Sequence, residues 1–151
     1  MSQSLAEMSV NYLDYDDKSL FLEIGQRASL SAEKPAAATA PPAELKVEFA
    51  HLGVNEDLVE LGKRIAKRLL RELNKLLCGD DAADKEEREK VAKTFGLTNE
   101  TVAAAIAAAL VSSFGIGAAI AALVAAIFVK RILAPTIEET CAVWTEALSR
   151  A

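Results

Sequence analysis

The residues from 102 to 129 form a run of twenty-eight positions without a charged side chain. Twelve of them are Ala and twelve are Val, Ile, Leu or Phe, and Lys130 and Arg131 end the run. About 20 apolar residues cross a hydrocarbon core of about 30 Å, so a run of this length is the usual sign of a transmembrane helix. The strongly apolar positions together favour insertion by roughly 4 to 7 kcal/mol. The chain must therefore either place this run in a membrane or cover it with the remainder of the fold.

A group of Ser and Gly residues, SSFGIG at 112–117, interrupts the apolar run. If the helix breaks there, residues 102–113 and 118–129 form two helices of about 18 Å each, and neither can cross a bilayer alone. Such a pair could enter a membrane from one side as a hairpin, or it could be the buried core of a helical bundle. The pattern leaves both interpretations open, together with that of one long helix.

Small residues recur at every fourth position within this part of the chain, at Ser113, Gly117, Ala121 and Ala125. On one helix these positions form a smooth strip that lets two backbones approach closely, as in the small-xxx-small packing of membrane helices. The strip predicts a helix–helix contact, either within one molecule or between copies. Because Ala is abundant here, a chance recurrence is the alternative interpretation.

Two short segments near the N-terminus, at 19–30 and 45–49, alternate apolar and polar residues. Alternation at period two is typical of a strand with one buried face. The segment between them, 31–43, is rich in Pro and Ala and is predicted to be a stiff loop. We therefore expect a small antiparallel strand pair. Two strands alone are marginally stable, so the pair would pack on the helices or add to the sheet of a protein partner.

A basic amphipathic helix is predicted between Asn55, a suitable N-cap, and Gly79, a suitable stop. Its apolar residues recur at three- and four-residue spacing, at Leu58, Leu61, Ile65, Leu69, Leu73 and Leu76. The opposite face carries Lys63, Arg64, Lys67, Arg68, Arg71 and Lys75. With Glu72 as the single acid among them, this segment has six positive charges and one negative charge in a chain of net charge −5. Such a face can lie on anionic lipid or on an acidic partner, and the alternative is a solvated surface.

The last part of the chain is predicted to form a C-terminal amphipathic helix. After Pro135, the spacing of Thr136 and Glu139 is that of a capping box. The apolar face of this helix carries Ile137, Cys141, Trp144 and Leu148. Trp144 is the single Trp, and its position is compatible with a membrane interface or with a protein core.

The residue types that carry catalysis or bind metals are sparse in this chain. His51 is the single His, and Cys78 and Cys141 are 63 residues apart and belong to no CxxC pattern. We therefore expect no catalytic site, no cofactor and no metal. The two Cys could pair only if the fold brought them together, and a reducing cytoplasm is the simpler context for them. The segment 90–106 resembles a helix–turn–helix, but it continues into Ala and Ile without donors for bases, so no nucleic acid partner is expected.

The sequence as a whole predicts an α+β fold that is mostly α, with the strand pair in residues 1–54 and a helical region in residues 55–151. The favoured function is that of a non-enzymatic, membrane-associated protein that self-assembles through its central hydrophobic helix, as a small membrane-perturbing effector would. The alternative is a soluble helical-bundle module for binding, or an adaptor, with the Ala-rich helix as its buried core. No signal peptide is apparent, so we expect a cytoplasmic N-terminal region with the protein at a membrane or, in the alternative, a cytoplasmic protein.

Overall fold

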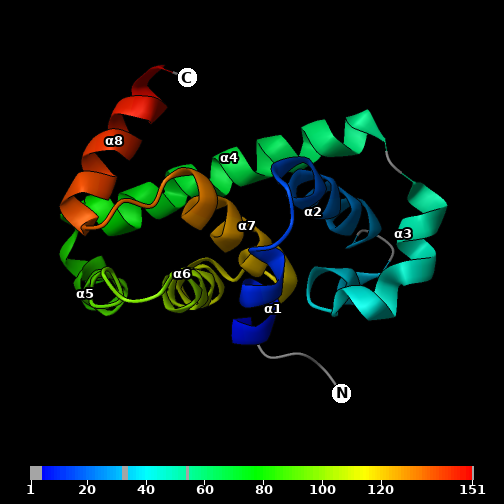
Figure 1. Ribbon diagram of the computed structural model, residues 1–151, viewed down its shortest axis with the longest axis horizontal. Helices are drawn as coiled ribbons and strands as arrows, with labels where there is room; N and C mark the ends of the chain where they lie inside the picture. Colours follow the sequence, from blue (N-terminus) through cyan, green and yellow to red (C-terminus); the bar gives the residue numbers. More distant parts are fainter. Residues whose placement is uncertain (1–4, 32–33, 54, 151) are drawn as a thin grey trace.

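The computed structural model describes residues 5–31, 34–53 and 55–150 and shows a helical protein, with no strand in those ranges. The α-helices are α1 (Leu5–Tyr12), α2 (Asp17–Ser31), α3 (Lys46–Leu52), α4 (Glu56–Cys78), α5 (Lys85–Ala92), α6 (Asn99–Phe114), α7 (Ala118–Arg131) and α8 (Ile137–Arg150). Three short 3-10 helices lie between them: η1 (Pro35–Ala38), η2 (Pro42–Leu45) and η3 (Ala82–Asp84). The long helix α4 runs along one side of the molecule, and α1 and α8 lie on opposite sides (Figure 1).

The predicted strand pair is wrong, and with it the α+β class, because both segments are helical. On α2, Leu20, Phe21 and Ile24 are buried, which is the spacing of one helix face. The period-two pattern grouped Leu22 with this face and left out Phe21. On α3, Val47 is 79% exposed, so the alternation there does not follow burial. The described part of the chain therefore offers no strand edge to a partner's sheet.

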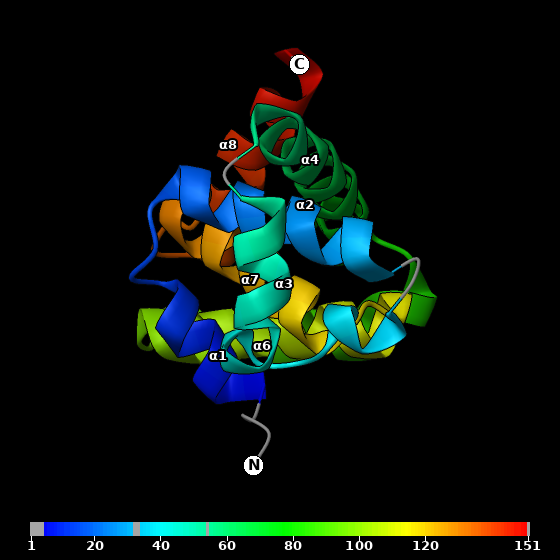
Figure 2. The ribbon, with the colours of Figure 1, turned by 90° about the vertical axis from the view of Figure 1, so that its right-hand side faces the viewer.

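The helix α7 lies at the centre of the molecule. Ala119 and every residue from 121 to 129 are buried. In two perpendicular views α7 lies between α1 and α6 on one side and α2 and α4 on the other (Figures 1 and 2). A helix that is apolar all round must be covered on all sides, and its neighbours supply that cover. Helices from both the 1–54 and the 55–151 segments contribute to this single core, which favours the buried-core interpretation of the apolar run.

The apolar run is divided into two helices at Gly115. Gly115 has a φ of 65°, in the left-handed region, and the N–H of Ile116 donates to the carbonyl oxygen of Leu110 at 3.4 Å, as in a Schellman ending. Gly117 then precedes α7, and a Cβ on it would lie 2.5 Å from the carbonyl oxygen of Ala38. In Figure 1, α6 is seen end-on whereas α7 runs across the view. Among the described residues, no helix combines the length and the apolar character needed to span a membrane.

The helices α2 and α4 cross with their backbones in close contact at two Gly residues. A Cβ on Gly25 would lie 1.9 Å from the carbonyl oxygen of Leu58, and a Cβ on Gly62 would lie 1.8 Å from that of Phe21. Both distances are below 3.0 Å, a separation that a real Cβ atom essentially never shows from such a neighbour. The two Gly residues therefore set the separation of these helices.

We expect Gly62→Ala to lower the free energy of unfolding by about 1–3 kcal/mol, because α2 and α4 would have to move apart. The loss should appear even though Ala favours a helix over Gly by about 1 kcal/mol. Urea unfolding followed by circular dichroism measures the effect. Arg68→Ala, at an exposed position of the same helix, is the control and should change stability by less than about 0.5 kcal/mol. Equal urea midpoints for the two variants would argue against the close crossing.

Candidate functional site: an apolar groove with a cationic rim

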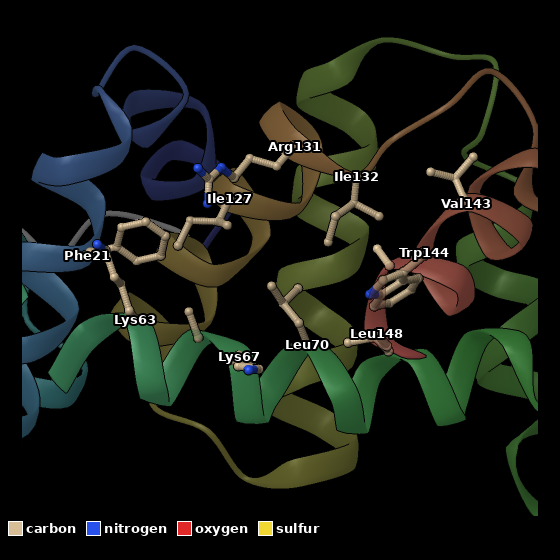
Figure 3. A pocket seen from close by; sticks show the side chains of 12 residues that line it. Phe21, Lys63, Lys67, Leu70, Ile127, Arg131, Ile132, Val143, Trp144 and Leu148 are labelled. Carbon is tan, nitrogen blue, oxygen red and sulfur yellow. The ribbon is translucent and has the colours of Figure 1, made fainter. Parts of the chain in front are cut away.

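A groove of about 460 Å³ opens between α4, α7 and α8, with Phe21 of α2 at one end (Figure 3). The helices α4 and α8 contribute most of the residues that line it, and the end of α7 lies between them. A volume of this size is within the range of about 300–1,000 Å³ that is typical of small-molecule sites. This groove is the candidate functional site.

The interior of the groove is apolar because each helix turns a buried face toward it. Ala66 and Leu70 lie one turn apart on α4, and Ile127 comes from α7. On α8, Trp144 is 2% exposed and packs edge-on against Phe128, with the ring centroids 5.2 Å apart. Trp144 therefore occupies a core position, which is one of the two environments that the sequence left open for it.

The rim of the groove is positively charged. The lining includes three cations and no carboxylate, and the cations are Lys63, Lys67 and Arg131. The Arg131 guanidinium is held by Asp17, with Nε 2.9 Å from Oδ2. The Lys63 ammonium lies 3.4 Å from the carboxylate of Glu60. Lys67 is exposed and forms no ion pair within the described ranges.

The indole N–H of Trp144 is a buried donor without an acceptor among the described residues. Buried polar groups in proteins are nearly always paired, because an unpaired donor costs about 1–3 kcal/mol. Figure 3 shows this nitrogen on the side of the ring that faces the groove. The groove therefore combines an apolar interior, a cationic rim and one neutral hydrogen-bond donor.

A disulfide between Cys78 and Cys141 fastens α8 to α4, with the two Cα atoms 5.6 Å apart. The sequence suggested a reducing context for these residues, whereas the fold brings them together. Cys78 is the last residue of α4, and Cys141 lies three residues before Trp144 on α8, so the bond fixes the wall that carries the indole. The side-chain amide of Asn74 adds a second tie by donating to the hydroxyl of Thr145 at 3.3 Å. The one hint in the sequence was the place of Cys141 on the apolar face of its helix.

The six basic residues predicted to form one face of α4 are all exposed, and they fall into two sets. Lys63 and Lys67 line the groove. The other four do not line it: Arg64, Arg68, Arg71 and Lys75. Lys75 lies 3.6 Å from the carboxylate of Glu72, whereas the three Arg residues have no ion pair in the part of the chain that the structure describes. The groove therefore uses only part of the predicted basic face.

The four small residues of the predicted packing strip do not share one helix. Ser113 is exposed near the end of α6, whereas Gly117 precedes α7 and approaches η1. Ala121 and Ala125 are fully buried within α7. A contact between copies through these two Ala residues would therefore require α7 to lose its cover.

A second group of polar side chains, which does not line the groove, is buried around Arg27 of α2. The Arg27 guanidinium donates to the carboxylate of Glu23 at 2.8 Å and to the hydroxyl of Tyr12 at 3.1 Å. It also donates to the carbonyl oxygens of Ala37 and Ala40, at 2.9 and 2.6 Å. Burial, and then the charge of Glu23, raises the pKa of Tyr12 well above its ordinary value near 10, so its hydroxyl stays protonated and donates to Glu23. Because these polar groups bond one another, we assign the group, here called the Arg27 cluster, a structural role.

Within the described residues, no three His, Cys, Asp or Glu side chains are grouped so that they could hold a metal ion. The groove combines apolar surface, three cationic side chains and the uncharged N–H donor of Trp144. Comparison of the chain with protein-family models, with curated proteins and with solved structures finds no match.

Proposed function

We propose that this protein is a non-enzymatic helical binding module that holds an apolar ligand in the groove between α4, α7 and α8. The observation that carries the proposal is the groove itself, about 460 Å³ in volume and apolar inside. Concave apolar sites with a few placed polar groups are the usual form of ligand-binding sites. In this proposal the covered helix α7 is the scaffold on which the groove is built.

The composition of the groove favours binding over catalysis. Its lining contains no Ser, Thr, Cys, His, Asp or Glu. General acid–base catalysis and most nucleophilic catalysis depend on those residue types. The two Lys residues in the lining are exposed at the rim. A binding module is therefore the simplest role that accounts for these side chains.

A role in perturbing membranes would place different demands on the fold. The helix α7 would have to leave the cover of α1, α2, α4 and α6, which would expose its buried residues to solvent before they reached lipid. Each buried Val, Leu, Ile or Phe side chain of α7 contributes roughly 1.5–3 kcal/mol to folding, so this exposure is costly. A ligand enters the groove without such a rearrangement, and we therefore prefer the binding role.

Binding of N-phenyl-1-naphthylamine, an uncharged fluorophore whose emission rises in apolar surroundings, tests the proposal. Ala147 lines the groove and is exposed on α8, so Ala147→Phe fills the groove without disturbing the core. Ala142→Phe adds the same side chain to the same helix outside the groove. We expect saturable binding to the wild type and to Ala142→Phe, and about tenfold weaker binding to Ala147→Phe because the ligand loses apolar contact area.

Energy transfer from Trp144, the single Trp, to the bound fluorophore reports whether the ligand lies beside the indole. Circular dichroism of both Phe variants verifies that they remain folded. A lack of saturable binding, or equal affinities of the two folded variants, would refute the proposed function.

A further inference from the structure

Taking the proposed function as its premise, we infer that the ligand is a single-chain amphiphile with an anionic oxygen head group, such as a medium-chain carboxylate. The chain lies over the apolar interior formed by Ala66, Leu70 and Ile127. The head group lies at the rim beside Lys67 and accepts a hydrogen bond from the indole of Trp144. A volume of about 460 Å³ is that of a site for a drug-sized ligand, which suits one medium-length chain better than a two-chain lipid.

The charge at the groove is opposite in sign to the charge of the whole chain. The chain carries a net charge of −5, yet the groove lining includes three cations and no carboxylate. Beside apolar walls these charges attract an anion more strongly than they would on an open surface. A cationic head group would be repelled there, and an uncharged one would gain nothing from the rim. The rim therefore selects for an anion.

Lys67 is the cation that remains available to a head group. Arg131 is held by Asp17 at 2.9 Å, and Lys63 approaches Glu60 at 3.4 Å. Lys67, by contrast, has no ion-pair partner in the described part of the chain. Figure 3 shows it on α4 between Lys63 and Leu70, where the charged rim meets the apolar interior. An amphiphile needs this arrangement, with charge directly beside apolar surface.

The indole N–H of Trp144 narrows the chemistry of the head group. It is buried, has no acceptor among the described residues and faces the groove. A carboxylate supplies lone pairs for the indole as well as a negative charge for an ammonium group. A purely apolar ligand would leave the donor unpaired and would bind less tightly for that reason. An oxygen acid therefore accounts for both polar features of the groove.

The test compares decanoate, decanol and decyltrimethylammonium, which share one apolar chain and differ in head group. Each is titrated into the full chain below its micelle concentration and followed by calorimetry at low and high salt. We expect decanoate to bind at least about tenfold more tightly than decanol at low salt, with a smaller difference at high salt. Lys67→Gln should reduce this preference. Arg68→Gln, which removes an exposed charge from α4 outside the groove, should retain it.

The single Trp gives one indole signal in a ¹H–¹⁵N correlation spectrum, which provides a second and independent readout. We expect decanoate to move the indole proton of Trp144 downfield, because the indole N–H gains a hydrogen bond to a charged acceptor. Such a bond is stronger than the bond to a neutral acceptor. The shift should be larger with decanoate than with decanol, and it should be absent with decyltrimethylammonium.

Four outcomes would overturn the inference, and they bear differently on the proposed function. Equal affinities for decanoate and decanol would remove the anion preference and leave the groove a general apolar site. Failure of all three decyl compounds and of the uncharged fluorophore would overturn both proposals. Binding of the protein to vesicles of anionic phospholipid, without binding of monomeric decanoate, would indicate that it recognises a membrane surface instead. Decanoate binding that is insensitive to Lys67→Gln and leaves the indole signal in place would locate the anion elsewhere.

Discussion

Arg27→Ala is expected to lower the free energy of unfolding by about 3–5 kcal/mol, because it removes the partner of a buried carboxylate. The side chain of Arg27 is 0% exposed and that of Glu23 is 7% exposed. The substitution leaves Glu23 without its ion pair and the carbonyl oxygens of Ala37 and Ala40 without their donor. An uncompensated buried charge is far more unfavourable than the intact pair is favourable, so the effect should be large.

Urea unfolding followed by circular dichroism measures this loss. Arg68→Ala removes an exposed Arg and should change stability by less than about 0.5 kcal/mol. The double variant Glu23→Gln/Arg27→Met leaves no charge buried in the Arg27 cluster and should recover part of the loss. Similar stabilities for Arg27→Ala and Arg68→Ala would be incompatible with the structural role assigned to this cluster.

Reduction of the disulfide between Cys78 and Cys141 is expected to lower the free energy of unfolding by about 4 kcal/mol. The two residues are separated by 63 positions, and the chain-entropy relation gives about this value for a loop of such length. The loop encloses α5, α6 and α7, so the constraint acts on the helices that form the core. Because α8 is one wall of the groove, the same reduction should also weaken ligand binding.

The comparison is between urea unfolding of the wild type with and without dithiothreitol. The double variant Cys78→Ala/Cys141→Ala is the matched control and should behave like the reduced wild type. Thiol titration of the denatured, unreduced protein should detect no free thiol, and reduction should release both. An unchanged urea midpoint on reduction, or reactive thiols in the untreated protein, would show that the bond does not have this role.

Helices were predictable where the sequence carries its own start and stop signals. The helix α4 begins after Asn55, whose side chain accepts from the N–H of Asp57 at 2.8 Å, and Gly79 follows its last residue. Thr98 caps α6, and the hydroxyl of Thr136 accepts from a backbone N–H at the start of α8. Such signals act within one helical turn, so they do not depend on the remainder of the fold.

The strand prediction failed because burial on α2 includes a charged residue. Leu20, Ile24 and Arg27 are all buried on this helix, but an Arg counts as exposed in any pattern of apolar and polar residues. Apart from Glu23 one turn earlier, its backbone acceptors lie ten or more residues further along the chain, at Ala37 and Ala40. No local pattern reports these partners.

The sequence did not predict the groove either, because the pattern of large apolar residues does not show which face of α4 is buried. The spacing of large apolar residues pointed to Leu61, Ile65 and Leu69 as the buried face. Leu73 and Leu76 are buried as predicted, but before them the structure buries Gly62, Ala66 and Leu70, one position further along than the predicted residues. Small residues register weakly on a hydrophobicity scale, yet they allow the close approach that fixes which side of a helix is covered. This difference places Lys63 and Lys67 at the edge of an apolar surface, whereas the sequence left open whether their face meets anionic lipid, an acidic partner or solvent.

The disulfide fastens α8 to α4 near the N-terminal end of α8. The disulfide joins Cys141 to the last residue of α4, and the hydrogen bond from Asn74 to Thr145 joins the next turn of α8 to α4. Beyond it, the last part of α8 projects past α4 (Figure 1). Both ties lie within one helical turn of Trp144, so they hold the part of α8 that carries the indole. We therefore expect the indole of Trp144 to keep its place when ligands of different chain length bind in the groove.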